Sequence, residues 1–72
     1  MPGAKIYYRN ESERARLQEK YPELDAVWLP VPEKMKDSEG PLVCRDNEPL
    51  EKCRIGEIHI EKMYYDSMDE ED

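Results

Sequence analysis

The sequence predicts a small α+β domain, in which an antiparallel sheet of three to four short strands carries one helix. Three observations lead to this prediction: a run of alternating apolar and charged residues, a capped helical segment, and short β-prone runs between turn residues. The domain should span residues 1–65, with residues 32–41 as a mobile, disordered loop and residues 66–72 as a mobile acidic tail. Neither segment offers enough apolar surface to offset the entropy of ordering its backbone.

The alternating run is Ile55–Tyr65, and it is predicted to be the main strand of the sheet. Ile58, Ile60 and Tyr64 fall on one face at the two-residue period of a half-buried strand, and charged residues occupy the other face. Ile60 lies in the middle of this run, so we expect its side chain to belong to the hydrophobic core. The rest of so short a chain must pack against this segment.

The helical segment begins after Asn10, which is a good N-cap residue. Glu13 stands three residues later, where its carboxylate can reach back as in a capping box. Leu17 and Tyr21 follow at the i, i+4 spacing of a buried stripe. Pro22 ends the helix, because the residue before a proline is disfavoured in the helical region.

Three further runs are β-prone. Lys5–Arg9 should form the first strand, and Leu42–Arg45 should begin a hairpin whose turn lies at residues 46–49. Leu24–Val31 also suits a strand, but Pro30 and Pro32 cannot donate hydrogen bonds to a neighbouring strand. This third run is therefore expected at an edge of the sheet.

Cys44 and Cys53 flank the predicted turn, as partners across a hairpin would. The pair indicates either a disulfide or two buried thiols, since most cytosolic proteins keep cysteines reduced but those of hyperthermophiles are an exception. Zinc bound by both cysteines, His59 and a carboxylate is a weaker alternative, because the close ligand pairs of zinc sites are missing. No metal or cofactor site is therefore predicted.

The charge of the chain is −7 and is unevenly distributed. Residues 1–36 hold seven Lys/Arg against six Asp/Glu, whereas residues 37–72 hold four against twelve. Five of the seven residues 66–72 are acidic, which suits a solvated tail or an arm for a basic partner. This sign disfavours direct contact with nucleic acid, and no run is long and apolar enough for a membrane span or a signal peptide. A cytoplasmic protein is expected.

The residues indicate a binding protein and not an enzyme, because no convergent catalytic set is visible. His59 is the only histidine, and no Cys/His pair or carboxylate pair is marked out for catalysis. Aromatic residues stand in pairs, and two successive residues of a strand point to opposite faces, so at most one of each pair can enter a one-sided core. The other either contacts a partner or covers a thin core from its second side. The predicted partner-binding residues are Tyr7, Tyr8, Trp28, Ile60, Met63, Tyr64 and Tyr65.

One short match concerns the partner. Glu57, Ile60, Met63 and Tyr64 stand at the spacing of the peptide box that docks proteins on the DNA sliding clamp, with Glu in place of Gln and Met in place of the first aromatic. Glu, Lys and Arg are abundant, whereas Gln occurs only at Gln18 and Asn only at Asn10 and Asn47, a composition that is typical of hyperthermophile proteins. In length, acidity and this composition, the whole chain resembles the Thermococcales inhibitors of the sliding clamp (proliferating cell nuclear antigen). The resemblance implies a small protein that opposes the clamp ring or its partners and so inhibits clamp-dependent DNA replication.

The expected function is therefore inhibition of the archaeal clamp by a protein that is monomeric when free. Two alternatives remain open at this point. One is an acidic mimic of nucleic acid that blocks another DNA-binding protein, and the other is a small zinc- or thiol-dependent protein.

Overall fold

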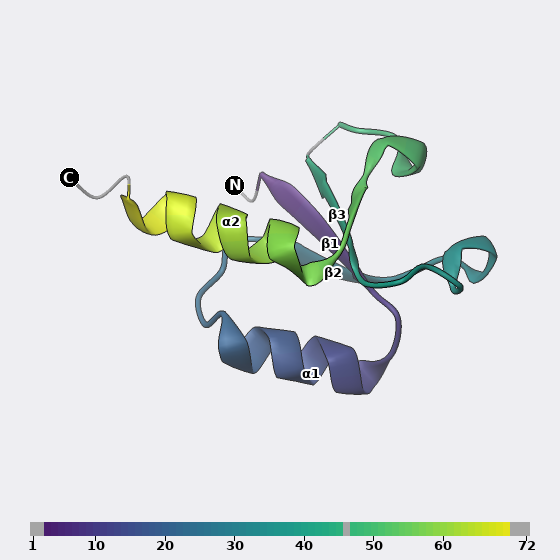
Figure 1. The fold of residues 1–72 in the computed structure, drawn as a ribbon, viewed down its shortest axis with the longest axis horizontal. Coiled ribbons are helices and arrows are strands. Elements are labelled where there is room, and N and C mark those ends of the chain that lie inside the picture. The colour runs from purple at the N-terminus through teal and green to yellow at the C-terminus, as the bar shows by residue number, and fades with distance from the viewer. Residues whose placement is uncertain (1–2, 46, 70–72) are drawn as a thin grey trace.

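The computed structural model describes residues 3–45 and 47–69. The described elements are the strands β1 (Ala4–Tyr8), β2 (Val27–Pro30), β3 (Leu42–Arg45) and β4 (Arg54–Ile55) and the helices α1 (Glu11–Lys20) and α2 (Glu57–Asp69) (Figure 1). Two 3₁₀ turns, at residues 33–35 and 50–52, lie in the connections. The α+β class is confirmed, but the structure has a second helix that was not predicted.

The sheet is mixed, with strand order β2-β1-β3-β4. β1 pairs with β3 and β3 with β4 in antiparallel fashion, whereas β1 and β2 run parallel. The prediction of a wholly antiparallel sheet is thus wrong for β2, because α1 carries the chain back to the end of the sheet where β1 began. β2 is an edge strand, as its prolines predicted.

Helix α1 follows the sequence prediction closely. The Asn10 side chain accepts a hydrogen bond from the backbone N–H of Glu13 at 2.9 Å, so the predicted N-cap is confirmed. Leu17 and Tyr21 are buried, at 0% and 2% exposure, as the i, i+4 stripe predicted. The Glu13 carboxylate reaches back past Asn10 and accepts from the backbone N–H of Arg9 at 2.8 Å.

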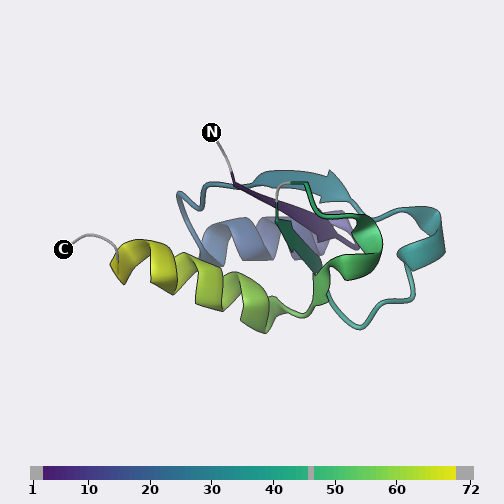
Figure 2. The same ribbon diagram turned by 90° about the horizontal axis from the view of Figure 1, so that it is seen from above.

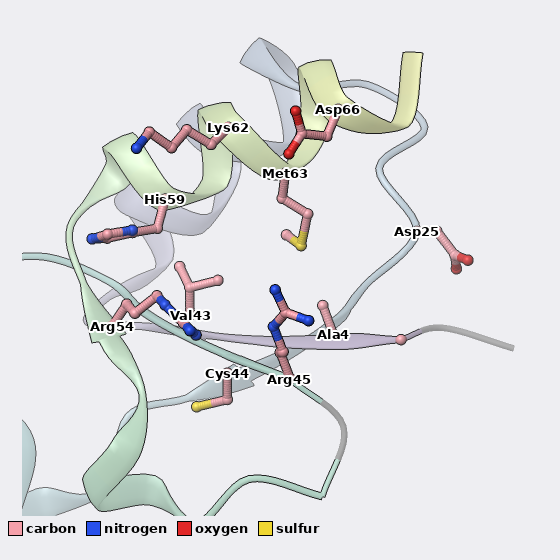
Figure 3. Close-up of a pocket in the computed structure, with 11 residues that line it drawn as sticks. Ala4, Asp25, Val43, Cys44, Arg45, Arg54, His59, Lys62, Met63 and Asp66 are labelled. Atoms are coloured by element: carbon pink, nitrogen blue, oxygen red, sulfur yellow. The ribbon is translucent and has the colours of Figure 1, made fainter. Parts of the chain in front are cut away.

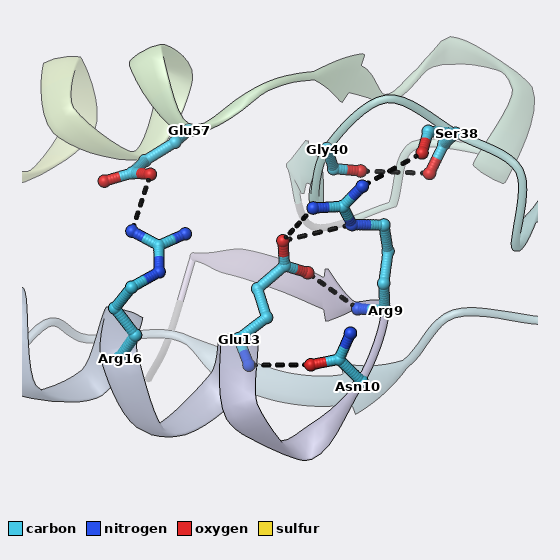
Figure 4. A network of polar contacts seen from close by, with 7 residues as sticks. All are labelled: Arg9, Asn10, Glu13, Arg16, Ser38, Gly40 and Glu57. Carbon is cyan, nitrogen blue, oxygen red and sulfur yellow. Dashed lines mark hydrogen bonds and ion pairs between the residues drawn. The ribbon is translucent and has the colours of Figure 1, made fainter.

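The Arg9–Glu13 pair is the best-connected ion pair near the core (Figure 4). The Arg9 guanidinium donates to Glu13 Oε2 from Nη2 at 2.7 Å and from Nε at 3.1 Å, and Nη1 donates to the Ser38 carbonyl at 3.3 Å. Burial of Glu13 raises the pKa of its carboxyl, but the hydrogen bonds and charge of Arg9 outweigh this and leave that pKa lowered. The pair thus ties the start of α1 to the loop after β2.

We expect the Arg9–Glu13 pair to make the protein less stable in acid. A carboxyl whose pKa is lowered by folding stabilises the protein above its unfolded pKa and loses this contribution as the pH falls through the folded value. Thermal unfolding followed from pH 6 downward should therefore show a smaller fall in Tm for Glu13→Gln than for the wild type. Glu19→Gln, a matched change at an exposed position of α1, should keep the wild-type slope. Equal slopes for all three proteins would contradict this role.

Helix α2 replaces the predicted main strand. The alternation at residues 57–61 fits a strand, but Ile60, Met63 and Tyr64 stand at i, i+3 and i+4, the spacing of one helix face. The helix buries these residues against the core, and Ile60 has 0% exposure, so its predicted place in the core is confirmed. Gly56 permits the transition, because its φ of +122° is unfavourable for any other residue.

Both helices pack against the face of the sheet that carries Ile6 and Val43, and Figure 2 shows this arrangement from above. Ile6 pairs with Val43 on β3 and with Trp28 on β2, and these side chains meet Leu17 and Tyr21 of α1 in the core. The core therefore fills the space between the sheet and the two helices.

Neither α1 nor α2 packs against the second face of the sheet. The register places one apolar residue from each strand in a row across this face: Leu29, Tyr7, Leu42 and Ile55. Leu42 is buried, Tyr7 and Leu29 are half-buried, and Ile55 is 49% exposed.

The predicted hairpin is present, although its second strand is only Arg54–Ile55, and of the two alternatives for its cysteines the structure contains the disulfide. β3 and β4 pair with Leu42 opposite Ile55 and Val43 opposite Arg54, which makes Cys44 and Cys53 the next pair along the ladder. The two cysteines form a disulfide with their Cα atoms 4.5 Å apart. Because both sulfurs are in the disulfide, the cysteines are neither reduced thiols nor zinc ligands in this structure.

The predicted loop and tail differ from expectation in part. Residues 33–35 form a 3₁₀ turn, and Pro41 and Gly40 at the end of the loop are buried, so the segment is not without structure. Its mobility stays a prediction, which amide hydrogen exchange tests. The tail was predicted to begin at Asp66, but α2 continues to Asp69, and residues 70–72 lie outside the described part of the chain.

Candidate functional site

Four of the seven predicted partner-binding residues belong to the core or pack against it. Ile60 is fully buried, and Trp28, Met63 and Tyr64 are half-buried against the core cluster. The Tyr64 ring meets the Tyr21 ring edge-on at 5.2 Å. In this fold, the core accounts for most of the apolar surface of these four side chains.

The residues of the clamp-box match face inward as well. Their segment is helical, which suits such a box, but Ile60 and Tyr64 point into the core and are not free to enter a groove on another protein. Glu57 is held by α1, with Arg16 at 3.0 Å and Lys20 at 2.9 Å from its two oxygens (the Arg16 contact is drawn in Figure 4). The hydrogen bond from Lys20 is the largest cause of the lowered pKa of Glu57.

The remaining three predicted residues are not among those that pack against the core cluster. Tyr7 is half-buried on the sheet face without helices, and Tyr8 is half-buried with the Arg14 guanidinium 6.0 Å from its ring centre. Tyr65 on α2 is 52% exposed. Ile58, seven residues earlier on the same side of the helix, is 55% exposed.

We call Ile58 and Tyr65 the outer pair of α2. They are two helical turns apart, about 10 Å along the axis, and point away from the side of α2 that carries Ile60. The exposed residues Glu61 and Lys62 lie between them. The outer pair is thus an apolar surface bordered by charge, and the strand prediction missed it because it assigned Ile58 to the core.

A groove of about 490 Å³ opens between α2 and the sheet (Figure 3). Ala4 on β1, Val43 on β3 and Met63 on α2 give it an apolar lining. Its size is in the range of small-molecule sites in proteins. We call this feature the α2 groove.

Basic side chains gather at one end of the α2 groove. Arg54, His59 and Lys62 line that end, and Arg45 projects toward Met63 in the middle (Figure 3). Asp66 lines the groove beside Met63, and Asp25 lies on the side away from His59, with its carboxylate turned outward. The groove therefore combines an apolar lining with a cationic end, in a protein whose charge is −7.

Sequence reasoning did not find the α2 groove, because its residues come from distant segments. One signal was available: residues 37–72 contain only four Lys/Arg, namely Arg45, Lys52, Arg54 and Lys62. Three of these four line the groove. An acidic half-chain that places most of its cations at one site indicates a site for negative charge.

The described residues bring together few groups for catalysis. Cys44 and His59 both line the α2 groove, but Cys44 is bound in the disulfide and its sulfur points away from the groove (Figure 3). No group of three or more His, Cys, Asp or Glu side chains among them could hold a metal ion. None of the described helices is long and apolar enough to cross a membrane.

Comparison with known proteins gave no relative: no protein-family model, no curated protein and no solved structure matched the chain.

Proposed function

We propose that the protein acts by binding another protein and not by catalysis, with the archaeal sliding clamp as the first partner to test. The observation that carries the proposal is the outer pair of α2, two large apolar side chains that are more than half exposed. Apolar and aromatic side chains surrounded by charged ones are typical anchors of protein interfaces. The resemblance in size and acidity to the Thermococcales clamp inhibitors supports the choice of partner.

The proposed interface is the solvent side of α2, centred on Tyr65. It does not use the clamp-box positions, because Ile60 and Tyr64 are needed in the core. In this proposal the free protein is a monomer in the cytoplasm, and its docking blocks ring assembly or the docking of other clamp partners. Inhibition of clamp-dependent DNA replication would follow.

Size-exclusion chromatography of the protein mixed with purified clamp tests the proposal. We expect co-elution, or a change in the oligomeric state of the clamp. Tyr65→Ala should weaken binding by about thirtyfold, equivalent to ~2 kcal/mol, while Tm stays unchanged. Tyr7→Ala removes the same side chain from the sheet face and should leave the affinity unchanged.

Two outcomes would contradict the proposal. If the clamp neither co-elutes nor changes its oligomeric state, it is not the partner. If Tyr65→Ala lowers Tm without lowering affinity in the folded protein, Tyr65 supports the fold and the interface lies elsewhere. Trp28→Ala provides the comparison, since Trp28 packs against the core and its loss should lower Tm.

A second candidate is an acidic mimic of nucleic acid that blocks a DNA-binding protein. It is favoured by the net charge of −8 over residues 37–72, which hold four Lys/Arg against twelve Asp/Glu. Three of these four basic residues line the α2 groove, so few remain elsewhere in this half of the chain to offset its acidic residues. Binding by mimicry should weaken steeply as salt rises and should depend on residues 66–72. Binding that depends on Tyr65 and changes little with salt would favour the first proposal.

A further inference from the structure

The proposed protein-binding function does not explain the basic side chains that line the α2 groove. Arg45 and Arg54 reach it from paired strands, and His59 and Lys62 reach it from α2. Of these, Arg54 has one loose ion pair, with Glu48 at 3.7 Å, and no described residue forms an ion pair with Arg45 or Lys62. The described residues therefore neutralise the cationic end only weakly.

The backbone fixes the two arginines side by side. Arg54 lies opposite Val43, so it points to the helix side of the sheet, and Arg45 points to the same side two residues after Val43. Neighbours in this diagonal relation are about 7–8 Å apart, within reach of one shared anion for long side chains. The Cys44–Cys53 disulfide, next to both arginines in the chain, joins the two strands at this point.

We propose that the α2 groove binds a small organic anion, a phosphate or carboxylate group carried on an apolar body. The anionic group lies among Arg45, Arg54 and Lys62, with the His59 ring beside them. The apolar body rests against Val43 and Met63. Guanidinium groups suit this role, because their N–H donors match the geometry of phosphate and carboxylate oxygens.

The volume of about 490 Å³ favours a ligand with a body over a bare ion. The Asp66 carboxylate, beside Met63, repels an anion and so favours a position among the basic side chains. This inference stands apart from the proposed docking of a protein on the outer pair, and the test below requires no protein partner.

The test is an NMR titration of the full, oxidised chain at low salt, with phenyl phosphate as the probe. We expect saturating amide shifts at residues 43–45, 54 and 59–63. Inorganic phosphate should bind more weakly because it lacks the apolar body, and benzyl alcohol should not bind because it lacks the charge. Benzoate distinguishes the two anion types: binding as tight as that of phenyl phosphate assigns a carboxylate, and weaker binding assigns a phosphate.

Single substitutions give shifts of affinity in opposite directions. Lys62→Gln and Arg45→Gln should each weaken phenyl phosphate binding about fivefold, and Asp66→Asn should strengthen it. Lys34→Gln makes the same charge change as Lys62→Gln at an exposed position outside the groove, and should change the affinity less than about twofold. All four positions are exposed, so the variants should fold, which their spectra will show.

Three results would overturn the proposal. The shifts could fail to saturate or could map away from the groove. Lys34→Gln could weaken binding as much as Lys62→Gln, which would indicate only the general charge of the protein. Asp66→Asn could weaken binding, which would place the anion elsewhere.

Discussion

Ile60→Ala is expected to lower the free energy of unfolding by about 2–5 kcal/mol, enough to unfold much of so small a domain. Ile60 has 0% exposure and joins α2 to the core, where it belongs to one cluster with Ile6 and Val43 of the sheet and Leu17 and Tyr21 of α1. Truncating its side chain removes buried apolar surface and leaves a cavity that the rigid surroundings fill only in part. Chemical denaturation measures this loss.

Ile58→Ala is the matched control, because it makes the same change two residues earlier on the same helix. Ile58 is 55% exposed, so this variant should lose less than about 0.5 kcal/mol. The pair of variants also tests the second helix itself, since a strand would place both isoleucines on the same face. Similar losses for the two variants would contradict α2 and favour a strand.

Reduction of the Cys44–Cys53 disulfide is expected to lower the free energy of unfolding by about 2–3 kcal/mol. The bond joins residues nine positions apart, and a loop of this length loses that much chain entropy from the unfolded state. Denaturation with and without a phosphine reductant measures the effect. Thiol titration of the unfolded, unreduced protein should find no free thiol.

A double variant, Cys44→Ala with Cys53→Ala, separates the disulfide from other effects of the reductant. Its stability should lie below that of the oxidised wild type and should not change when the reductant is added. If the wild type also showed no change, or if free thiols were found without reduction, the disulfide would not contribute to this fold.

Part of the fold was predictable because its signals are local. Asn10 caps α1 with its own side chain, and Pro22 ends the helix through its fixed backbone geometry. The edge position of β2 follows in the same way from prolines that cannot donate hydrogen bonds. These features depend on neighbours within a few residues, so the sequence alone was sufficient.

The parallel pairing of β1 and β2 could have been predicted but was not. A strand, a ten-residue helix and a second strand in succession form a parallel unit, because the helix returns the chain to the end of the sheet where the first strand began. The sequence-based prediction had every strand pair antiparallel, as in the hairpin that begins at Leu42. That hairpin is confirmed, but it determines only its own half of the sheet.

The sequence predicted some of the residues with exposed side chains, but it did not predict which side of the segment 57–65 faces the core. Tyr65 was predicted to be available to a partner and is exposed, but Ile60 and Tyr64 were placed in the same set and are part of the core region. Whether a residue of an amphipathic segment faces a partner or the core depends on the period of that segment. Because a strand period was assumed, Ile58 was assigned to the apolar face and Met63 to the partner-binding set. In the helix, Ile58 is exposed and Met63 packs against the core.

What the sequence by itself determined is that Ile60 is buried, that α1 begins after Asn10, and that the two cysteines face each other across a hairpin. What only the tertiary structure decided is that residues 57–69 form a helix and that three distant cations share one groove. Within Ile55–Tyr65 the alternation is strict only over residues 57–61, and so short a stretch is compatible with both periods, so local patterning leaves the choice open. The tertiary structure decides it, because only a helix places Ile60, Met63 and Tyr64 together on one side, where they pack against the core cluster.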